Sequence, residues 1–172
     1  MALYFPAPKW DGTSIKQGAP RFGANRGKRV HGACDLYAPL KSDVVAVDAG
    51  IVVEISGPGF AGTTEAISIS HEGLGIIRYG EVVQIPEEFK KIGAKVEKGG
   101  ILIGKVGKAV KSYPPMLHFE LFDGSATGRL TVRSNDVEYY NEGVLKDADY
   151  QRRKDLMNPT KFLERLWLEG KK

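Results

Sequence analysis

Apolar and polar residues alternate along the middle of the chain with the period of β-strands. Between Val44 and Gly107, apolar runs of four to eight residues are separated by glycine-containing turns, a pattern typical of an all-β sheet or sandwich. Alternation around one of these runs places Ile67, Ile69 and His71 on one face of a strand. The strands predicted in this way are Val44–Val47, Ile51–Ile55, Ala66–Ser70, Ile76–Tyr79, Ile101–Val106 and Leu117–Phe122.

The C-terminal end of the chain shows helical spacing instead. Residues 161–168 carry apolar side chains on one face of a helix, which predicts a helix that docks on the core. Residues 86–92, with a proline at the first turn, and residues 150–157 are predicted to form two shorter helices. Asn158–Thr160 mark the boundary before the final helix, whose apolar face consists of Phe162, Leu163, Leu166 and Trp167.

These patterns predict a mainly β fold, an antiparallel β-sheet or sandwich with a short C-terminal helix. Residues 1–28 are rich in glycine, proline and basic residues and are predicted to form an extended arm. Residues 29–172 are predicted to form a single domain, and the polar segment 135–150 a loop or insertion. The aromatic residues of the arm are expected to pack on the domain: Tyr4, Phe5 and Trp10.

Composition excludes several classes of protein. The 172 residues suffice for one real core, and 42% hydrophobic and 27% charged residues are ordinary for a globular domain. The net charge of +4 is too weak to indicate nucleic-acid binding, and the longest internal basic run is Arg152–Lys154. A single cysteine, Cys34, excludes an internal disulfide. No apolar run approaches a membrane span, and Met1–Pro6 lacks the features of a secretory signal peptide.

The candidate chemistry lies in the histidines, of which the chain has three. His31 stands four residues before Asp35, and His118 lies in a distant predicted strand. Two imidazoles and a carboxylate suit zinc, and three protein ligands leave one coordination position for water. The spacing therefore indicates a catalytic metal site. Cys34, between two of these residues, is expected to be a small buried residue without a metal role.

The segments around these residues resemble the lysostaphin-type (LytM-like) zinc endopeptidases, metallopeptidase family 23. The resemblance runs from about Arg21 to Asp123, and its motifs are residues 29–39, 44–52, 92–107 and 117–120. It implies the duplicated hybrid β fold of that family, one Zn²⁺ per chain and bacterial peptidoglycan as the substrate. It also implies that the zinc ligands are His31, Asp35 and His118.

Two departures from the family pattern affect the expected mechanism. The family has a Tyr-x-His motif where this chain reads Tyr79-Gly80-Glu81, and a His-x-His motif where it reads Met116-Leu117-His118. The missing imidazoles normally activate the zinc water and stabilise the oxyanion. Either Glu81 replaces one as the general base, as a carboxylate does in other zinc proteases, or Glu81 is an ordinary strand carboxylate and the domain only binds cell wall or activates another hydrolase. The retained ligands favour an active endopeptidase.

Further residues are assigned to the surroundings of the metal. Tyr79, Tyr113, Arg78 or backbone N–H groups are candidates for stabilising the oxyanion, whereas Met116 is expected only to pack. His71 is expected to have a structural or substrate-groove role. Glu120 is expected either to hydrogen-bond a ligand imidazole or backbone group, or to face solvent.

The Val44–Gly107 stretch is also similar to a biotinyl or lipoyl carrier barrel. It lacks an acceptor lysine in a characteristic turn, however, and that fold leaves His31, Asp35 and His118 unexplained.

Without a visible signal peptide, the protein is expected to be made in the cytoplasm. It would then act in the periplasm or at the cell wall, as a phage lysis or tail protein or as a delivered antibacterial effector. Its mildly basic surface suits anionic wall polymers.

Overall fold

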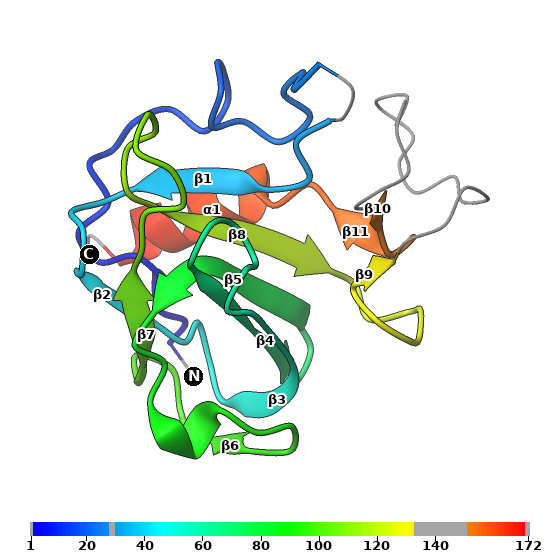
Figure 1. The fold of residues 1–172 in the computed structure, drawn as a ribbon. Coiled ribbons are helices and arrows are strands. Elements are labelled where there is room, and N and C mark those ends of the chain that lie inside the picture. The colour runs from blue at the N-terminus through cyan, green and yellow to red at the C-terminus, as the bar shows by residue number, and fades with distance from the viewer. Residues whose placement is uncertain (1, 28–29, 133–150, 171–172) are drawn as a thin grey trace.

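The computed structural model describes residues 2–27, 30–132 and 151–170 (Figure 1). The predicted loop or insertion at 135–150 lies outside these residues. The long strands are β3 (Gly50–Ser56), β4 (Glu65–His71), β5 (Gly75–Val83), β7 (Leu102–Val106) and β8 (Met116–Phe122). The shorter ones are β1 (Cys34–Tyr37), β2 (Asp43–Val45), β6 (Lys95–Val96), β9 (Thr131–Val132), β10 (Gln151–Arg152) and β11 (Leu156–Met157), and the α-helix is α1 (Thr160–Glu169).

One antiparallel sheet dominates the described part of the chain. Its strands follow the order β1-β8-β5-β4-β3-β6, with β7 joining β5 to β2 and β11 added beside β8. A separate pair joins β9 and β10. Because side chains alternate along each strand, β8 presents Leu117, Phe119 and Leu121 to one face and His118 and Glu120 to the other. One face of β8 therefore belongs to the core, and the other carries polar chemistry.

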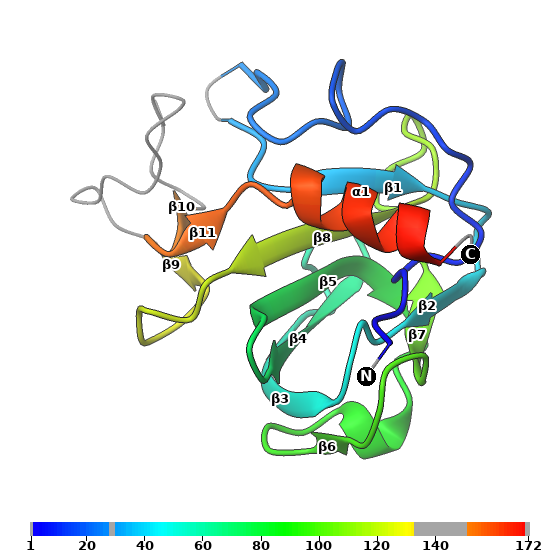
Figure 2. The ribbon, with the colours of Figure 1, turned by 180° about the vertical axis from the view of Figure 1, so that it is seen from behind.

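Helix α1 covers the core side of β1 and β8 (Figure 2). Leu163 and Leu166 are buried, and the ring of Phe162 stacks on that of Phe119 in β8 with centroids 6.2 Å apart. The helix predicted at residues 161–168 is therefore confirmed. It is the only α-helix among the described residues, and it is too short and too polar to cross a membrane.

The N-terminal arm contacts this helix through aromatic rings. Trp10 and Phe5 each lie 4.9 Å, centroid to centroid, from Trp167 of α1, and 5.4 Å from one another. The backbone N–H of Tyr4 donates to the carbonyl of Val47 at 2.9 Å. Burial of large rings contributes strongly to stability, so the arm and the last helix stabilise each other.

The predicted strands are all present, with ends shifted by a few residues, but the local pattern missed several elements. The helix predicted at 86–92 is a single 3-10 turn, Glu87–Phe89. The helix predicted at 150–157 is wrong, because the described residues 151–157 form β10, a tight turn and β11. In that turn Arg153 donates two hydrogen bonds of 2.7 Å to the carboxylate of Asp155. Leu156 of β11 pairs with Phe122 of β8. Pairing with strands distant in the chain therefore determines the structure of this segment, although its local sequence favours a helix.

Candidate metal centre

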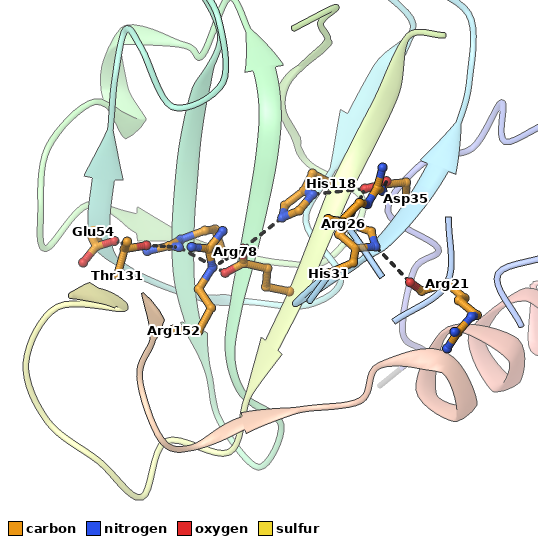
Figure 3. Close-up of polar contacts among 10 residues, drawn as sticks. Arg21, Arg26, His31, Asp35, Glu54, Arg78, His118, Thr131 and Arg152 are labelled. Atoms are coloured by element: carbon orange, nitrogen blue, oxygen red, sulfur yellow. Dashed lines mark hydrogen bonds and ion pairs between the residues drawn. The ribbon is translucent and has the colours of Figure 1, made fainter. Parts of the chain in front are cut away.

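Strand pairing brings the three predicted metal ligands together. Asp35 of β1 lies directly opposite His118 of β8 in the antiparallel register, and His31 lies just before β1. Asp35 Oδ1 is 3.1 Å from His31 Nε2 and 3.0 Å from His118 Nδ1 (Figure 3). The candidate ligand atoms of the three residues lie within 4.8 Å of one another, and no other such group occurs among the described residues. We call these three residues the His/Asp cluster.

The donor set and its spacing fit zinc. A tetrahedral zinc ion with bonds of about 2.0–2.1 Å holds its ligand atoms about 3.3 Å apart, and the two separations from Asp35 Oδ1 are close to this value. Two nitrogens and one oxygen are ligands that zinc accepts, and three protein ligands leave a fourth position open. The cluster therefore has the composition of a catalytic zinc site.

The opposite nitrogen of each imidazole is held by a hydrogen bond. His31 Nδ1 lies 2.9 Å from the carbonyl oxygen of Arg21, which can only accept, so this nitrogen carries the proton. His118 Nε2 lies 2.9 Å from Oε1 of Glu120 and donates to that carboxylate. Each bond directs the other nitrogen of its ring toward the cluster, the arrangement by which outer groups orient metal-binding histidines.

Glu120 belongs to a buried network of charges. Its Oε1 also accepts from Arg152 Nε at 2.6 Å, and its Oε2 accepts from Arg78 Nη1 at 3.0 Å. Arg78 is itself fully buried and is further bonded to Glu54 and to the hydroxyl of Thr131 (Figure 3). Burial alone raises the pKa of Glu120, but the charges of Arg152 and Arg78 and the bond from His118 outweigh it and hold this pKa far below its usual range. These partners therefore favour the ionised carboxylate.

Without a metal, the two imidazoles titrate differently. Burial lowers the pKa of His31. Burial also lowers that of His118, but the hydrogen bonds and charges of Asp35 and Glu120 outweigh it and raise the pKa of His118 to about 9. Asp35 is affected in the opposite sense: burial raises its pKa, while hydrogen bonds from His118 and His31 lower it well below the usual range. A metal and a proton therefore compete for His118 Nδ1.

Glu81 occupies a distorted position beside the cluster. Between the pairs Ile67–Tyr79 and Glu65–Val82, β5 has one residue more than β4, which makes a bulge at Gly80 and Glu81. Glu81 has φ +57°, the left-handed region that a non-glycine residue rarely adopts. A bulge re-aims the side chains that follow it.

Tyr79 and Val82, on either side of the bulge, are both fully buried in the core, so alternation from Val82 puts Glu81 on the opposite face, which carries His118. Burial is the largest influence and raises the pKa of Glu81; after it come the charges of His118, Asp35 and Arg26. Two of these residues belong to the His/Asp cluster, and Arg26 is bonded to it. Strict alternation would have placed Glu81 with Tyr79 on the core face. Because of the bulge, Glu81 lies instead on the face of the sheet that carries His118 and Glu120.

Gly80 is required for the packing around His118. It pairs with His118 across β5 and β8. A Cβ atom at this position would lie 2.6 Å from the ring of Phe60 and 3.2 Å from His118 Cδ2. The glycine therefore allows Phe60 to lie edge-on to the His118 ring, with centroids 5.8 Å apart.

The structure places His71 and Tyr79 on the face of the sheet opposite the cluster. His71 Nε2 lies 3.0 Å from the Tyr79 hydroxyl, and Tyr79 is fully buried on the face of the sheet that carries Phe119. The hydroxyl donates to His71 Nε2, whose ring carries its proton on Nδ1 toward the Ala49 carbonyl, and accepts from the backbone N–H of Val47 at 3.0 Å. Tyr113 is 52% exposed in the loop before β8. The alternation of β5 separates Tyr79 from its neighbour Gly80, which faces His118.

Neither Arg78 nor Met116 is available as an oxyanion donor. Arg78 is fully buried, and its Nη1 and Nη2 atoms donate within the buried network described above. Met116 is buried opposite Tyr37 of β1 and packs, as expected. Cys34 is fully buried with its Sγ 3.4 Å from the Thr160 hydroxyl of α1, on the core face.

The local pattern missed Arg26 and Arg152. Arg26 Nη2 donates to Asp35 Oδ2 at 3.1 Å, and Arg152 donates to Glu120, one step beyond His118. Arg26 lies in the glycine-rich arm, and Arg152 lies in the segment predicted to be helical. Only the basic character of both segments was visible in the sequence.

Comparison with known proteins places this arrangement in a family. The model of peptidase family M23 matches residues 29–129. No curated protein sequence matches significantly, whereas solved structures do. The catalytic domain of lysostaphin from Staphylococcus simulans is 19% identical and has a TM-score of 0.51, over 95% of this chain and 90% of that one.

Two further structures are more similar in sequence. A mutant catalytic domain of the prophage-encoded M23 protein EnpA from Enterococcus faecalis is 27% identical, with a TM-score of 0.51 over 72% of this chain and 88% of that one. A zinc-containing peptidase from Vibrio cholerae is 26% identical, with a TM-score of 0.52 over 70% of this chain and 36% of that one. The predicted mainly β fold of the lysostaphin type is therefore confirmed.

Proposed function

The chain belongs to peptidase family M23, and on that premise we propose that it is a zinc-dependent endopeptidase that hydrolyses peptide bonds in the cross-links of bacterial peptidoglycan. The observation that carries the proposal is the His/Asp cluster. Its ligand atoms lie within 4.8 Å of one another, and the Arg21 carbonyl and the Glu120 carboxylate turn both imidazoles toward the same point. One Zn²⁺ per chain would be held by His31, Asp35 and His118.

The residues around the cluster have different roles in the proposed reaction. Bound zinc would supply Lewis-acid chemistry, polarising a carbonyl and lowering the pKa of a water molecule. Glu120, fixed by Arg78 and Arg152, holds the His118 ring. Glu81 stands where the family has an imidazole; its carboxylate would accept the proton of the attacking water and return it to the leaving amine. Burial raises the pKa of Glu81, which makes its carboxylate a stronger base.

The setting proposed for this activity is a phage lysis or tail protein or a delivered antibacterial effector. The prophage origin of the Enterococcus faecalis neighbour agrees with the first of these. We take residues 29–172 as the peptidase domain and the arm 1–28 as part of the same folded unit. The contacts of Phe5 and Trp10 with Trp167 support that division.

The test is the release of new amine groups from purified peptidoglycan, with and without a chelator, with zinc measured on the same sample. Chelator-sensitive release that returns on adding zinc is the expected result. Bound zinc without release from several wall types would contradict the proposed activity. It would instead favour a domain that binds cell wall or activates another hydrolase.

A further inference from the structure

Arg26 lies at the edge of the His/Asp cluster. Its Nη2 donates to Asp35 Oδ2 at 3.1 Å, while the other oxygen of the same carboxylate, Oδ1, faces the two imidazoles (Figure 3). Arg26 therefore binds the side of Asp35 that a one-oxygen metal ligand leaves free. Only the width of one carboxylate separates the guanidinium from the metal position.

Most of the hydrogen-bonding capacity of Arg26 is unused. A guanidinium has five N–H donors, and Nη2 uses both of its own, one toward Asp35 and the other toward the carbonyl of Ala19 at 2.9 Å. Nε and Nη1 have no hydrogen-bond partner within the described parts of the chain. The side chain is 24% exposed, so part of it is open to solvent or to a bound molecule.

The backbone holds Arg26 in this place. The N–H of Gly23 donates to the carbonyl of His31 at 2.8 Å, and the N–H of His31 donates to that of Ala24 at 2.9 Å. These two bonds pair the backbone before Arg26 with the backbone after it in a short antiparallel ladder. The ladder includes the proposed metal ligand His31. The arm therefore delivers a cation to the cluster by the same contacts that position His31.

Two other cations near the cluster, Arg78 and Arg152, are committed elsewhere. Arg78 and Arg152 neutralise Glu120, and Arg78 also neutralises Glu54. Met116, at the family's imidazole position, has no donor. A peptidase of this kind needs a donor for the charge that forms on the carbonyl oxygen, and loss of one such donor costs about 10²–10³-fold in kcat in other enzymes.

We propose that Arg26 donates hydrogen bonds to the oxyanion of the tetrahedral intermediate and so replaces the imidazole that Met116 lacks. This inference rests on the proposed peptidase function. As the water oxygen bonds to the carbonyl carbon, the π electron pair moves to the carbonyl oxygen and the water proton passes to Glu81. When the C–N bond breaks, the electron pair returns to reform C=O and Glu81 gives the proton to the amine nitrogen, leaving a carboxylic acid and an amine.

The test compares Arg26→Gln and Arg26→Lys with Lys9→Gln, which removes an exposed cation from the same arm. All proteins are loaded with excess zinc, and zinc content is measured. Two readouts follow: kcat and KM on a cross-linked muropeptide, and the Kd of a phosphinic peptide, whose tetrahedral anion mimics the intermediate. Arg26→Gln should lower kcat about 10²-fold with KM changed little, and should weaken phosphinate binding by a similar factor. Lys should restore part of both, and Lys9→Gln should match the wild type.

The two proposals fail in different ways. If the wild type releases amines and zinc-loaded Arg26→Gln keeps kcat within about threefold, the role of Arg26 is overturned and the peptidase function stands. If no protein turns over, the proposed function is overturned, and the oxyanion role that rests on it falls as well. If Arg26→Gln loses activity only in proportion to lost zinc, and the zinc-loaded fraction binds phosphinate like the wild type, Arg26 merely positions Asp35 and the inference is again overturned.

Discussion

Asp35 and His118 face each other across β1 and β8, with Oδ1 and Nδ1 3.0 Å apart. They are 83 residues apart in the chain, so the metal centre depends on the register of one strand pair. A slip of one residue would turn His118 to the core face and Phe119 to the metal face. The alternation of β8, buried and apolar on its core face, fixes that register.

Removing His118 should therefore remove the metal. His118→Ala deletes one of three ligands, and we expect the purified protein to lose its zinc and any chelator-sensitive amine release together. The measurement is zinc per chain by elemental analysis after dialysis. His71→Gln is the matched control, because His71 is also a buried histidine but lies with Tyr79 on the other face. Equal zinc in His118→Ala and the wild type would refute the assignment of the ligands.

Glu120→Gln should weaken zinc binding without abolishing it. Glu120 accepts from His118 Nε2, and loss of such an outer partner typically costs 10–100-fold in metal affinity. The substitution also leaves Arg78 and Arg152 without their shared carboxylate. We therefore expect a loss of stability of about 3–5 kcal/mol. Zinc Kd from competition with a chromogenic chelator, with urea unfolding on the same protein, separates the two effects; an unchanged Kd would contradict the role given to Glu120.

Much of this centre could be predicted because its residues lie in short motifs. His31, Asp35 and His118 are chemically distinctive and occur in a chain with few histidines. The strands were visible because their apolar residues have period two. The register that places Asp35 against His118 is a property of two segments together, and no local pattern encodes it.

The unpredicted features have long-range physical causes. Arg152 contacts Glu120 because β10 and β11 pair with strands that lie well before them in the chain, whereas the local sequence favoured a helix. Glu81 faces the cluster because a bulge in β5 breaks the alternation. Arg26 was hidden in a segment whose glycines indicate only an irregular chain.

The pair Arg153–Asp155 should give stability that depends on pH. Burial raises the pKa of Asp155, but the hydrogen bonds and charge of Arg153 outweigh it, so the folded-state pKa is lowered. A lowered pKa contributes stability that is fully present above the unfolded value of about 3.9 and is lost as the pH falls through the folded value. Asp155→Asn should lower Tm at pH 7, and the gap to the wild type should narrow below about pH 4. The exposed Glu72→Gln should show no such trend, and a gap that stays constant down to acid pH would contradict the prediction.

Glu81→Gln should separate catalysis from metal binding. The amide keeps the size of the side chain and leaves the His/Asp cluster intact, so zinc content and Tm should match the wild type. Loss of a general base typically lowers kcat about 10²–10⁴-fold. Glu81→His recreates the Tyr-x-His motif of the family and should restore part of the rate. Full activity in Glu81→Gln would remove this residue from the mechanism.

The backbone at Glu81 adds a test that does not depend on turnover. A side chain at φ +57° costs about 1–2 kcal/mol, which glycine avoids. Glycine in turn adds about 0.5–1 kcal/mol of unfolded-state entropy. Glu81→Gly should therefore be as stable as Glu81→Ala or up to about 1 kcal/mol more stable, by urea unfolding of the zinc-free proteins. Both variants lose the carboxylate, so their difference reports only the backbone. If the glycine variant is clearly less stable than the alanine variant, Glu81 is not strained and the bulge does not hold its carboxylate at a cost.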